Sequence, residues 1–245
     1  MIDEQTVSEL VRKFQTGQQN VIREYCQHIF LLKFYSLKGA ERLPFKGGTA
    51  LRFVWGSPRF SEDLDFTGFK TNTRGIESLI ESTLAGIENE GIVADLIESK
   101  PTTGGHWALV GFHWLQFSTE VSLQVSLRSA SGGKTSVASV ASDFMPDYTL
   151  VHLSEESLVR EKVQALLIRA KPRDFYDLYF ILRRRLVFEP VFGKDKTLKQ
   201  KILSKMKGQP LDLKSELRDF LPASHHRLLK GFKETLKREI ERNLP

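Results

Sequence analysis

The residues best suited to chemistry lie in two short stretches, FKGGTAL at 45–51 and SEDLDF at 61–66, about a dozen residues apart. Gly47 and Gly48 would let the backbone approach a ligand closely, and free N–H groups at a helix start attract anions. Asp63 and Asp65 alternate on an expected strand, so both carboxylates leave one face. Two such oxygen ligands suit Mg²⁺. The combination predicts metal-assisted in-line displacement at phosphorus.

Each half of this pattern also has a plain structural interpretation. Gly-Gly-Thr often forms a turn in which the threonine caps a helix, and Asp-x-Asp is frequent at strand ends. Their occurrence together and in this order is what favours a phosphate and metal site.

The remaining elements follow from periodicity and from glycine and proline signals. Helices are expected at residues 3–15, 20–37, 49–55, 74–89, 154–170 and 173–185, and strands at 63–66, 92–98, 107–115 and 120–128. Gly132 and Gly133 mark a loop, and the segment after residue 185 is expected to be largely helical. We therefore predict an α+β fold, with domains at 1–150 and 151–245 and their boundary in a loop between Ser142 and Ser154.

Composition limits the class of protein. The chain has 245 residues, 40% of them hydrophobic, which suffices for a sizeable core. Its single cysteine, Cys26, lies in an apolar pattern typical of a buried thiol. Acidic residues near the start argue against a signal peptide, and no apolar run approaches the roughly 18 residues of a membrane span. We expect a soluble cytoplasmic protein.

Positive charge is concentrated near the C-terminus. Residues 193–245 hold 14 Lys and Arg against 7 Asp and Glu, whereas residues 1–192 hold 22 against 23. Such a basic segment is typical of a protein that binds a polyanion such as RNA. A solvated helix face with lysines that favour solubility is an equal alternative.

The two stretches resemble the AbiEii/AbiGii abortive-infection toxins, which are polymerase-β-like nucleotidyltransferases and the toxin halves of type IV toxin–antitoxin pairs. A second block supports the resemblance. It consists of Glu156, Lys162, Ala165, Leu166, Arg169 and residues 171–179, KPRDFYDLY. The resemblance covers roughly residues 40–185 and implies a small mixed β-sheet core, N-terminal helices and a C-terminal helical region.

The resemblance also implies roles for individual residues. Asp63 and Asp65 would hold Mg²⁺ or Mn²⁺ and act in catalysis. The nucleotide-binding residues would be Gly47, Gly48, Thr49, Ser61, Lys162 and Arg169, with Lys162 and Asp174 also catalytic.

Simple geometry agrees in part with these roles. Lys162 and Arg169 are seven residues apart on one helix, so they share a face and can bind one anion. Asp174 and Asp177 can instead form structural ion pairs with nearby arginines, and an Asp just after Pro172 can also cap a helix. For Asp177 a structural role is the preferred interpretation.

One departure from related enzymes concerns a third carboxylate, which many of them carry on a neighbouring strand. Here Gln124 occupies that position. Glu120 lies on the same strand face but about 13 Å away, too far to replace it directly. Two carboxylates could suffice, substrate or Asp174 could complete the site, or the enzyme could be weakened.

The sequence thus predicts transfer of a nucleotidyl group from a nucleoside triphosphate to an acceptor, with release of pyrophosphate. RNA, in particular a tRNA 3′ end, is the expected acceptor, and a protein hydroxyl is the alternative. An antitoxin protein is the expected partner. Two other functions stay open: a nucleotide- or RNA-binding module that lost turnover, and a metal-dependent nuclease.

Overall fold

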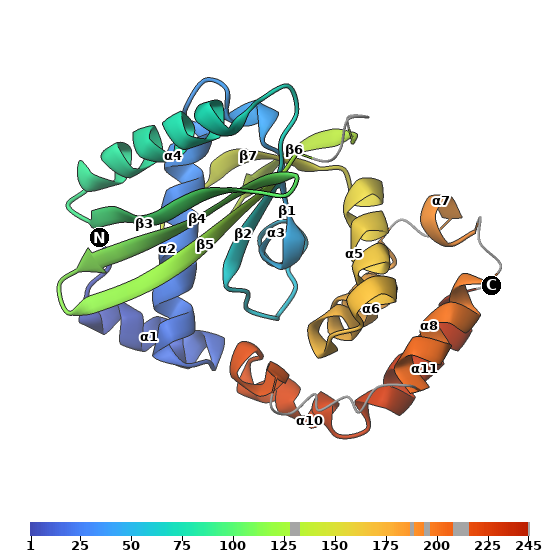
Figure 1. Cartoon of the computed structure of the whole chain (residues 1–245). Coiled ribbons are helices and arrows are strands. Elements are labelled where there is room, and N and C mark those ends of the chain that lie inside the picture. Colours follow the sequence, from blue (N-terminus) through green and yellow to red (C-terminus); the bar gives the residue numbers. More distant parts are fainter. Residues whose placement is uncertain (128–132, 187–188, 194–196, 208–215, 245) are drawn as a thin grey trace. The chain divides into compact units, whose positions relative to one another are not determined.

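The computed structural model describes residues 1–127, 133–186, 189–193, 197–207 and 216–244. The chain forms two compact units, Met1–Leu153 and Ser154–Pro245. The first unit contains the mixed sheet and the second is helical (Figure 1). The predicted α+β class is confirmed.

The first unit is built on a seven-stranded sheet with the order β3-β4-β5-β2-β1-β7-β6. Its strands are β1 (Phe45–Lys46), β2 (Asp63–Thr67), β3 (Val93–Thr102), β4 (Gly105–Trp114), β5 (Phe117–Ser126), β6 (Thr135–Val140) and β7 (Tyr148–Leu153). The pairs β2–β5 and β1–β7 are parallel, and the other pairs are antiparallel.

The two faces of this sheet differ in polarity. Apolar side chains such as Leu64, Phe112 and Leu123 are buried on one face, where α2 packs against β5 and β7 and α4 against β3 (Figure 1). The helices of this unit are α1 (Glu4–Phe14), α2 (Gln18–Tyr35), η1 (Ala40–Arg42), α3 (Gly47–Trp55) and α4 (Thr73–Glu88). Their positions confirm the helices expected at 3–15, 20–37 and 74–89. Cys26 is buried, as expected.

The expected loop between Ser142 and Ser154 is wrong, because β7 occupies Tyr148–Leu153 and forms part of the central sheet. β7 pairs with β1 on one side and with β6 on the other. Neither β6 nor β7 was expected; β7 pairs with β1, about a hundred residues earlier, and β6 joins the sheet through β7. The loop at Gly132 and Gly133 lies partly outside the described residues.

The second unit consists of helices, as expected. They are α5 (Glu155–Arg169), α6 (Pro172–Arg184), α7 (Glu189–Phe192), α8 (Leu198–Lys207), η2 (Arg218–Phe220), η3 (Ala223–His225), α10 (His226–Leu229) and α11 (Phe232–Asn243). Ser154 caps α5 by accepting a hydrogen bond from the Ser157 N–H at 3.3 Å. Among the described residues, no helix is long and apolar enough to cross a membrane.

Candidate active site

Asp63 and Asp65 lie on β2 with both side chains on one face of the sheet. Burial alternates along the strand: Leu64 and Phe66 are in the core, while the two aspartates are half-buried. The alternation expected from the sequence is therefore confirmed, and it places two carboxylates side by side on the polar face.

The start of α3 lies directly against one of these carboxylates. Gly47, the first residue of α3, has φ +86°, and a Cβ on it would meet Asp65 Oδ2 at 2.1 Å. Only glycine combines that backbone conformation with so close an approach. The N-cap residue, Lys46, makes no side-chain cap hydrogen bond. The helix start thus presents backbone N–H groups beside the Asp65 carboxylate, the arrangement expected of an anion site.

Gly48, the next residue of α3, lies against a second pair of side chains. A Cβ on Gly48 would meet the Arg59 guanidinium nitrogen at 2.5 Å and the Ser61 hydroxyl oxygen at 2.9 Å. Arg59 is buried and donates to the Phe60 carbonyl at 3.0 Å. Its positive charge therefore adds to the attraction of this helix start for anions. Sequence reasoning missed Arg59, because an isolated arginine in a loop carries no local signal.

Thr49 is fully buried, and its hydroxyl donates to the Asp63 carbonyl oxygen at 2.5 Å. The side chain expected to contact phosphate therefore joins α3 to β2. Its backbone N–H remains part of the helix start, and we assign the hydroxyl to positioning Asp63.

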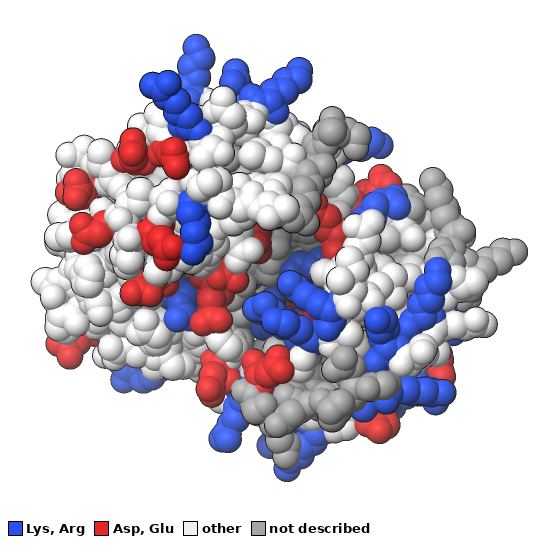
Figure 2. All heavy atoms as spheres, in the orientation of Figure 1, with Lys and Arg blue, Asp and Glu red and all other residues white. Residues whose placement is uncertain are grey.

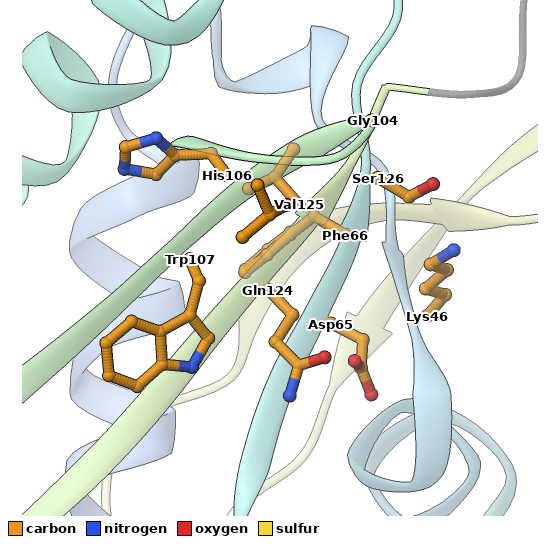
Figure 3. A pocket seen from close by; sticks show the side chains of 10 residues that line it. Lys46, Asp65, Phe66, Gly104, His106, Trp107, Gln124, Val125 and Ser126 are labelled. Carbon is orange, nitrogen blue, oxygen red and sulfur yellow. The ribbon is translucent and has the colours of Figure 1, made fainter. Parts of the chain in front are cut away.

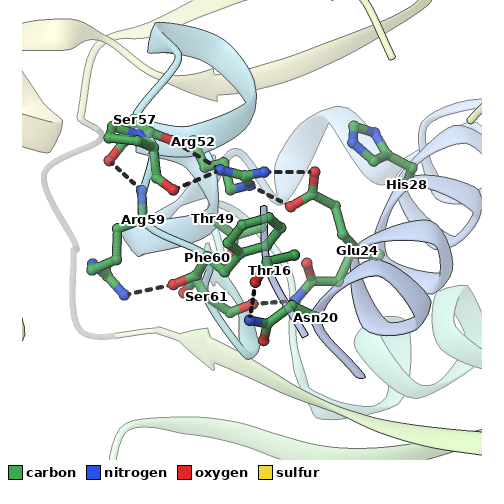
Figure 4. A network of polar contacts seen from close by, with 12 residues as sticks. Thr16, Asn20, Glu24, His28, Thr49, Arg52, Ser57, Arg59, Phe60 and Ser61 are labelled. Atoms are coloured by element: carbon green, nitrogen blue, oxygen red, sulfur yellow. Dashed lines mark hydrogen bonds and ion pairs between the residues drawn. The ribbon is translucent and has the colours of Figure 1, made fainter. Parts of the chain in front are cut away.

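The loop between α3 and β2 is held by a buried polar network (Figure 4). Arg52 pairs with Glu24 of α2 through two hydrogen bonds, one of them 3.0 Å long. It also donates to the carbonyls of Ser57 and Pro58, and its guanidinium lies 3.6 Å from the centre of the Phe60 ring. These contacts fix the loop that leads into Asp63.

Gln27 of α2 also supports this loop, because its amide donates to the carbonyls of Ser61 and Glu62 at 2.9 and 3.0 Å.

His28 is the residue after Gln27 on α2. It stacks on Phe53 with ring centres 3.9 Å apart, and it contacts the Tyr148 hydroxyl at 2.8 Å. Burial lowers the pKa of His28 to about 3, so this imidazole is neutral in the folded protein.

Five polar or aromatic residues form a row across the polar face of the sheet. The row follows the strand register: Lys100 of β3, Trp107 of β4, Gln124 of β5, Asp65 of β2 and Lys46 of β1. Four of them, all but Lys100, line one cavity of about 300 Å³ (Figure 3). The cavity thus extends from the start of α3 across the carboxylate to an aromatic ring.

Trp107 is held in place by contacts on two sides. Its indole N–H donates to the Ser122 hydroxyl at 3.0 Å, and the Lys100 ammonium lies 4.8 Å from the ring centre. His106 also borders the cavity, but its side chain points to the other face of the sheet (Figure 3). Lys46 and Trp107 were not predicted as site residues; Lys46 directly precedes Gly47 in the chain, whereas Trp107 joins the site only through strand pairing.

The register also confirms the position of Gln124, which lies directly beside Asp65 on the parallel strand β5. Glu120 lies four residues earlier on β5 and lines a second cavity of about 540 Å³ together with Glu62 and Asp63. Within the described residues, no group of three or more His, Cys, Asp or Glu side chains could hold a metal ion. The two aspartates nevertheless suit Mg²⁺, which is commonly bound by one or two carboxylates plus substrate phosphates and water.

Lys162 lies on α5 in the second unit and forms an ion pair with Asp177 of α6, with Nζ 2.7 Å from Oδ2. The two side chains are only 11% and 2% exposed. This contact agrees with the structural role preferred for Asp177. The predicted contact of Lys162 with phosphate remains a prediction.

Arg169 at the end of α5 and Asp174 of α6 form a second ion pair between these two helices. Arg169 donates three hydrogen bonds of 2.7 to 3.1 Å to the Asp174 carboxylate, which also accepts from the Lys171 backbone N–H at 3.0 Å. The Asp174 side chain is completely buried, whereas that of Arg169 is 42% exposed. This geometry favours a structural role for Asp174, and the predicted contact of Arg169 with the nucleotide remains a prediction.

Solved structures of other proteins have a similar architecture. MenT4, a nucleotidyltransferase toxin from Mycobacterium tuberculosis H37Rv, matches with 19% identity and a TM-score of 0.68, over 98% of this chain and 89% of its own. JHP933 from Helicobacter pylori matches with 21% identity and a TM-score of 0.58, over 93% and 95%. No curated protein matches. At these identities the likeness shows the fold, which is that of a nucleotidyltransferase.

The family follows from the sequence itself. The model of the family described as the nucleotidyl transferase AbiEii toxin of type IV toxin–antitoxin systems matches residues 30–242. The chain therefore belongs to this family. The match confirms the resemblance seen in the two motif blocks and extends it in both directions, so that the basic C-terminal segment, expected to lie outside it, is included.

Proposed function

We propose that the protein is an active, metal-dependent nucleotidyltransferase and the toxin of a type IV toxin–antitoxin pair. The observation that carries the proposal is the contact of Gly47 with the Asp65 carboxylate. It supports the proposal because a helix start, which attracts anions, lies next to a carboxylate that suits a metal ion, and a nucleoside triphosphate needs both.

In the proposed reaction, a hydroxyl oxygen of the acceptor attacks the α-phosphorus of a nucleoside triphosphate. The new P–O bond forms as the bond to the bridging oxygen breaks, and pyrophosphate leaves with the electron pair. The hydroxyl proton passes to water. The start of α3 and the neighbouring Arg59 would bind the phosphates that leave, and Gln124 would line the site without taking the proton.

Asp63 and Asp65 would hold Mg²⁺ or Mn²⁺, which would supply neutralisation of the phosphate charge in the transition state. The structure supports this through the two half-buried carboxylates on one strand face. Thr49 keeps Asp63 in place by its hydrogen bond to the Asp63 carbonyl.

The test compares Asp63→Asn and Asp65→Asn with Asp95→Asn, which changes an exposed aspartate on β3. Incubation with labelled triphosphates, Mg²⁺ and total RNA should give labelled RNA with the parent and with Asp95→Asn, and none with the other two. Expression of the parent should slow bacterial growth, and Asp65→Asn should relieve it. Wild-type transfer by either site variant would show that the assigned carboxylates are not required.

RNA is the acceptor that we propose, on the basis of the charge of the second unit. α8 exposes Lys201, Lys205 and Lys207, and α11 exposes Lys237. Lys and Arg side chains project from these helices on the face drawn in Figure 2. An antitoxin protein is the partner that membership of the family implies.

A nucleotide- or RNA-binding module without turnover is the second candidate, and Gln124 is the observation that favours it. Gln124→Asp would place a third carboxylate beside Asp65. If the parent is active, this variant should lower the Mg²⁺ concentration that transfer requires. A parent that binds triphosphate but transfers nothing, together with an active Gln124→Asp variant, would favour the module.

A further inference from the structure

The order of the residues in the row across the sheet indicates on which side of Asp65 pyrophosphate would leave and from which side the acceptor would approach. Lys46 and the start of α3 lie at the β1 end of the cavity, Asp65 lies in the middle, and Gln124 and Trp107 follow toward β4. The leaving pyrophosphate belongs at the end with the helix start, since that end attracts anions.

In phosphoryl and nucleotidyl transfer, the attacking and leaving oxygens lie roughly in line on opposite sides of phosphorus. If pyrophosphate leaves toward α3, the acceptor hydroxyl must approach from the other side of Asp65. That side of the cavity is formed by Gln124 and Trp107. The ring of Trp107 is two strands from Asp65, or about 10 Å.

We therefore infer that Trp107 is the stacking platform for the terminal base of a single-stranded RNA acceptor, an inference that rests on the proposed function. The ring is half-buried, and its N–H bond to Ser122 fixes its orientation. Lys100 occupies the side toward the edge strand. The other side, toward Gln124, is the one that a base can reach. Stacking of bases on aromatic rings is the common way in which proteins hold single strands.

The second cavity is less suited to this acceptor. It is lined by Glu62, Asp63 and Glu120, and its arginine, Arg23, is 3.3 Å from Glu62 in an ion pair. Glu120, which lies outside the proposed metal site, would repel a polyanion. The cavity with Trp107 contains one carboxylate, Asp65, and the positive Lys46, so RNA enters more favourably there.

The experiment measures KM for a short single-stranded RNA and, separately, Kd for the nucleoside triphosphate. Trp107→Ala should raise the KM for RNA by roughly 5- to 100-fold and leave the Kd for triphosphate unchanged. Trp107→Phe, which keeps a ring, should recover most of the loss. Trp55→Ala is the matched control, because Trp55 ends α3 and does not line this cavity. An RNA whose terminal nucleotide is abasic should bind parent and Trp107→Ala equally weakly.

Three results would overturn the inference. An unchanged KM for RNA would show that no base stacks on this ring, and a weakened triphosphate Kd with unchanged RNA KM would assign the ring to the nucleotide. Quenching of tryptophan fluorescence by RNA needs no turnover. If the parent transfers no nucleotide but RNA quenches its fluorescence, and this quenching is lost in Trp107→Phe, the result would support the platform and reject the proposed catalysis. If the protein transfers the nucleotide to a protein hydroxyl and Trp107→Ala does not change this transfer, the platform would be rejected and the proposed catalysis would stand.

Discussion

The Asp65 carboxylate lies against the Cα atom of Gly47, so that a methyl group on Gly47 would meet Oδ2 at 2.1 Å. This contact couples the conformation of the helix start to the position of a proposed metal ligand. A side chain at residue 47 must therefore move the carboxylate, the helix, or both.

Gly47→Ala is expected to abolish nucleotide transfer. The positive φ alone would cost about 1–2 kcal/mol of stability, and the displaced carboxylate would no longer face the helix start. Unfolding in denaturant and the transfer assay measure the two effects. Gly86→Ala is the control, since Gly86 lies inside α4 with its nearest neighbour 3.8 Å from the new methyl group, and it should keep full activity. An active Gly47→Ala variant would contradict the proposed role of this contact.

Lys162→Ala is expected to lower the free energy of unfolding by about 3–5 kcal/mol, because it removes the ion pair between Lys162 and the buried Asp177. Loss of toxicity in this variant alone would therefore not prove contact with phosphate. The double variant Lys162→Met with Asp177→Leu should recover most of the stability. If that folded variant binds triphosphate as the parent does, Lys162 has no role at the phosphates; weaker binding would support the predicted one.

The basic segment should contribute to RNA affinity and not to triphosphate affinity. Replacing Lys201, Lys205 and Lys207 of α8, all exposed, by Gln should flatten the dependence of log Kd on log salt by about one unit for each lost phosphate contact. Two further lysines of this segment, Lys194 and Lys196, lie outside the described residues. Lys38→Gln, an exposed change in the first unit, is the control. A fall in triphosphate affinity with unchanged RNA affinity would instead assign α8 to the nucleotide site.

His28 should make the protein less stable as the pH falls below about 6.5. Its pKa is about 3 when folded, against 6.5 as a free side chain. The unfolded chain therefore binds the extra proton between these values, and stability falls by up to about 1.4 kcal/mol per pH unit on acidification. Urea unfolding at several pH values between 7 and 5 gives the free energy of unfolding as a function of pH. This pH dependence should be weaker for His28→Phe, which keeps a ring against Phe53. Equal slopes would mean that His28 is protonated in the folded state.

The sequence alone was sufficient for the features that depend on neighbouring residues. The helices of both units and the shared face of Asp63 and Asp65 follow from short periodic patterns, and Gln124 was placed beside the carboxylates by resemblance. Features that depend on distant pairing could not be found in this way. Trp107 reaches the site because β4 pairs with β5 and β5 with β2, and no local pattern contains that order.

The same limit explains the error at residues 142–154. Residues 142–147, which include Pro146, do form a connection, and the apolar run that follows them is a strand that lies between β1 and β6. Arg59 was missed for a related reason: its significance comes from its distance to Gly48, which is a property of the folded loop.

The shortest strand of the sheet, β1, determines how firmly the two parts of the sheet are joined. β1 contains two residues, yet within the sheet it joins β2, which carries both aspartates, to the hairpin of β6 and β7, and it runs directly into α3. Such a seam is the natural place for local opening, since few hydrogen bonds must break there. Native-state hydrogen exchange should show β6 and β7 opening as one cooperative group. Because β1 runs directly into α3, a molecule that captured the open hairpin would leave the strand before Gly47 paired on one side only, with β2.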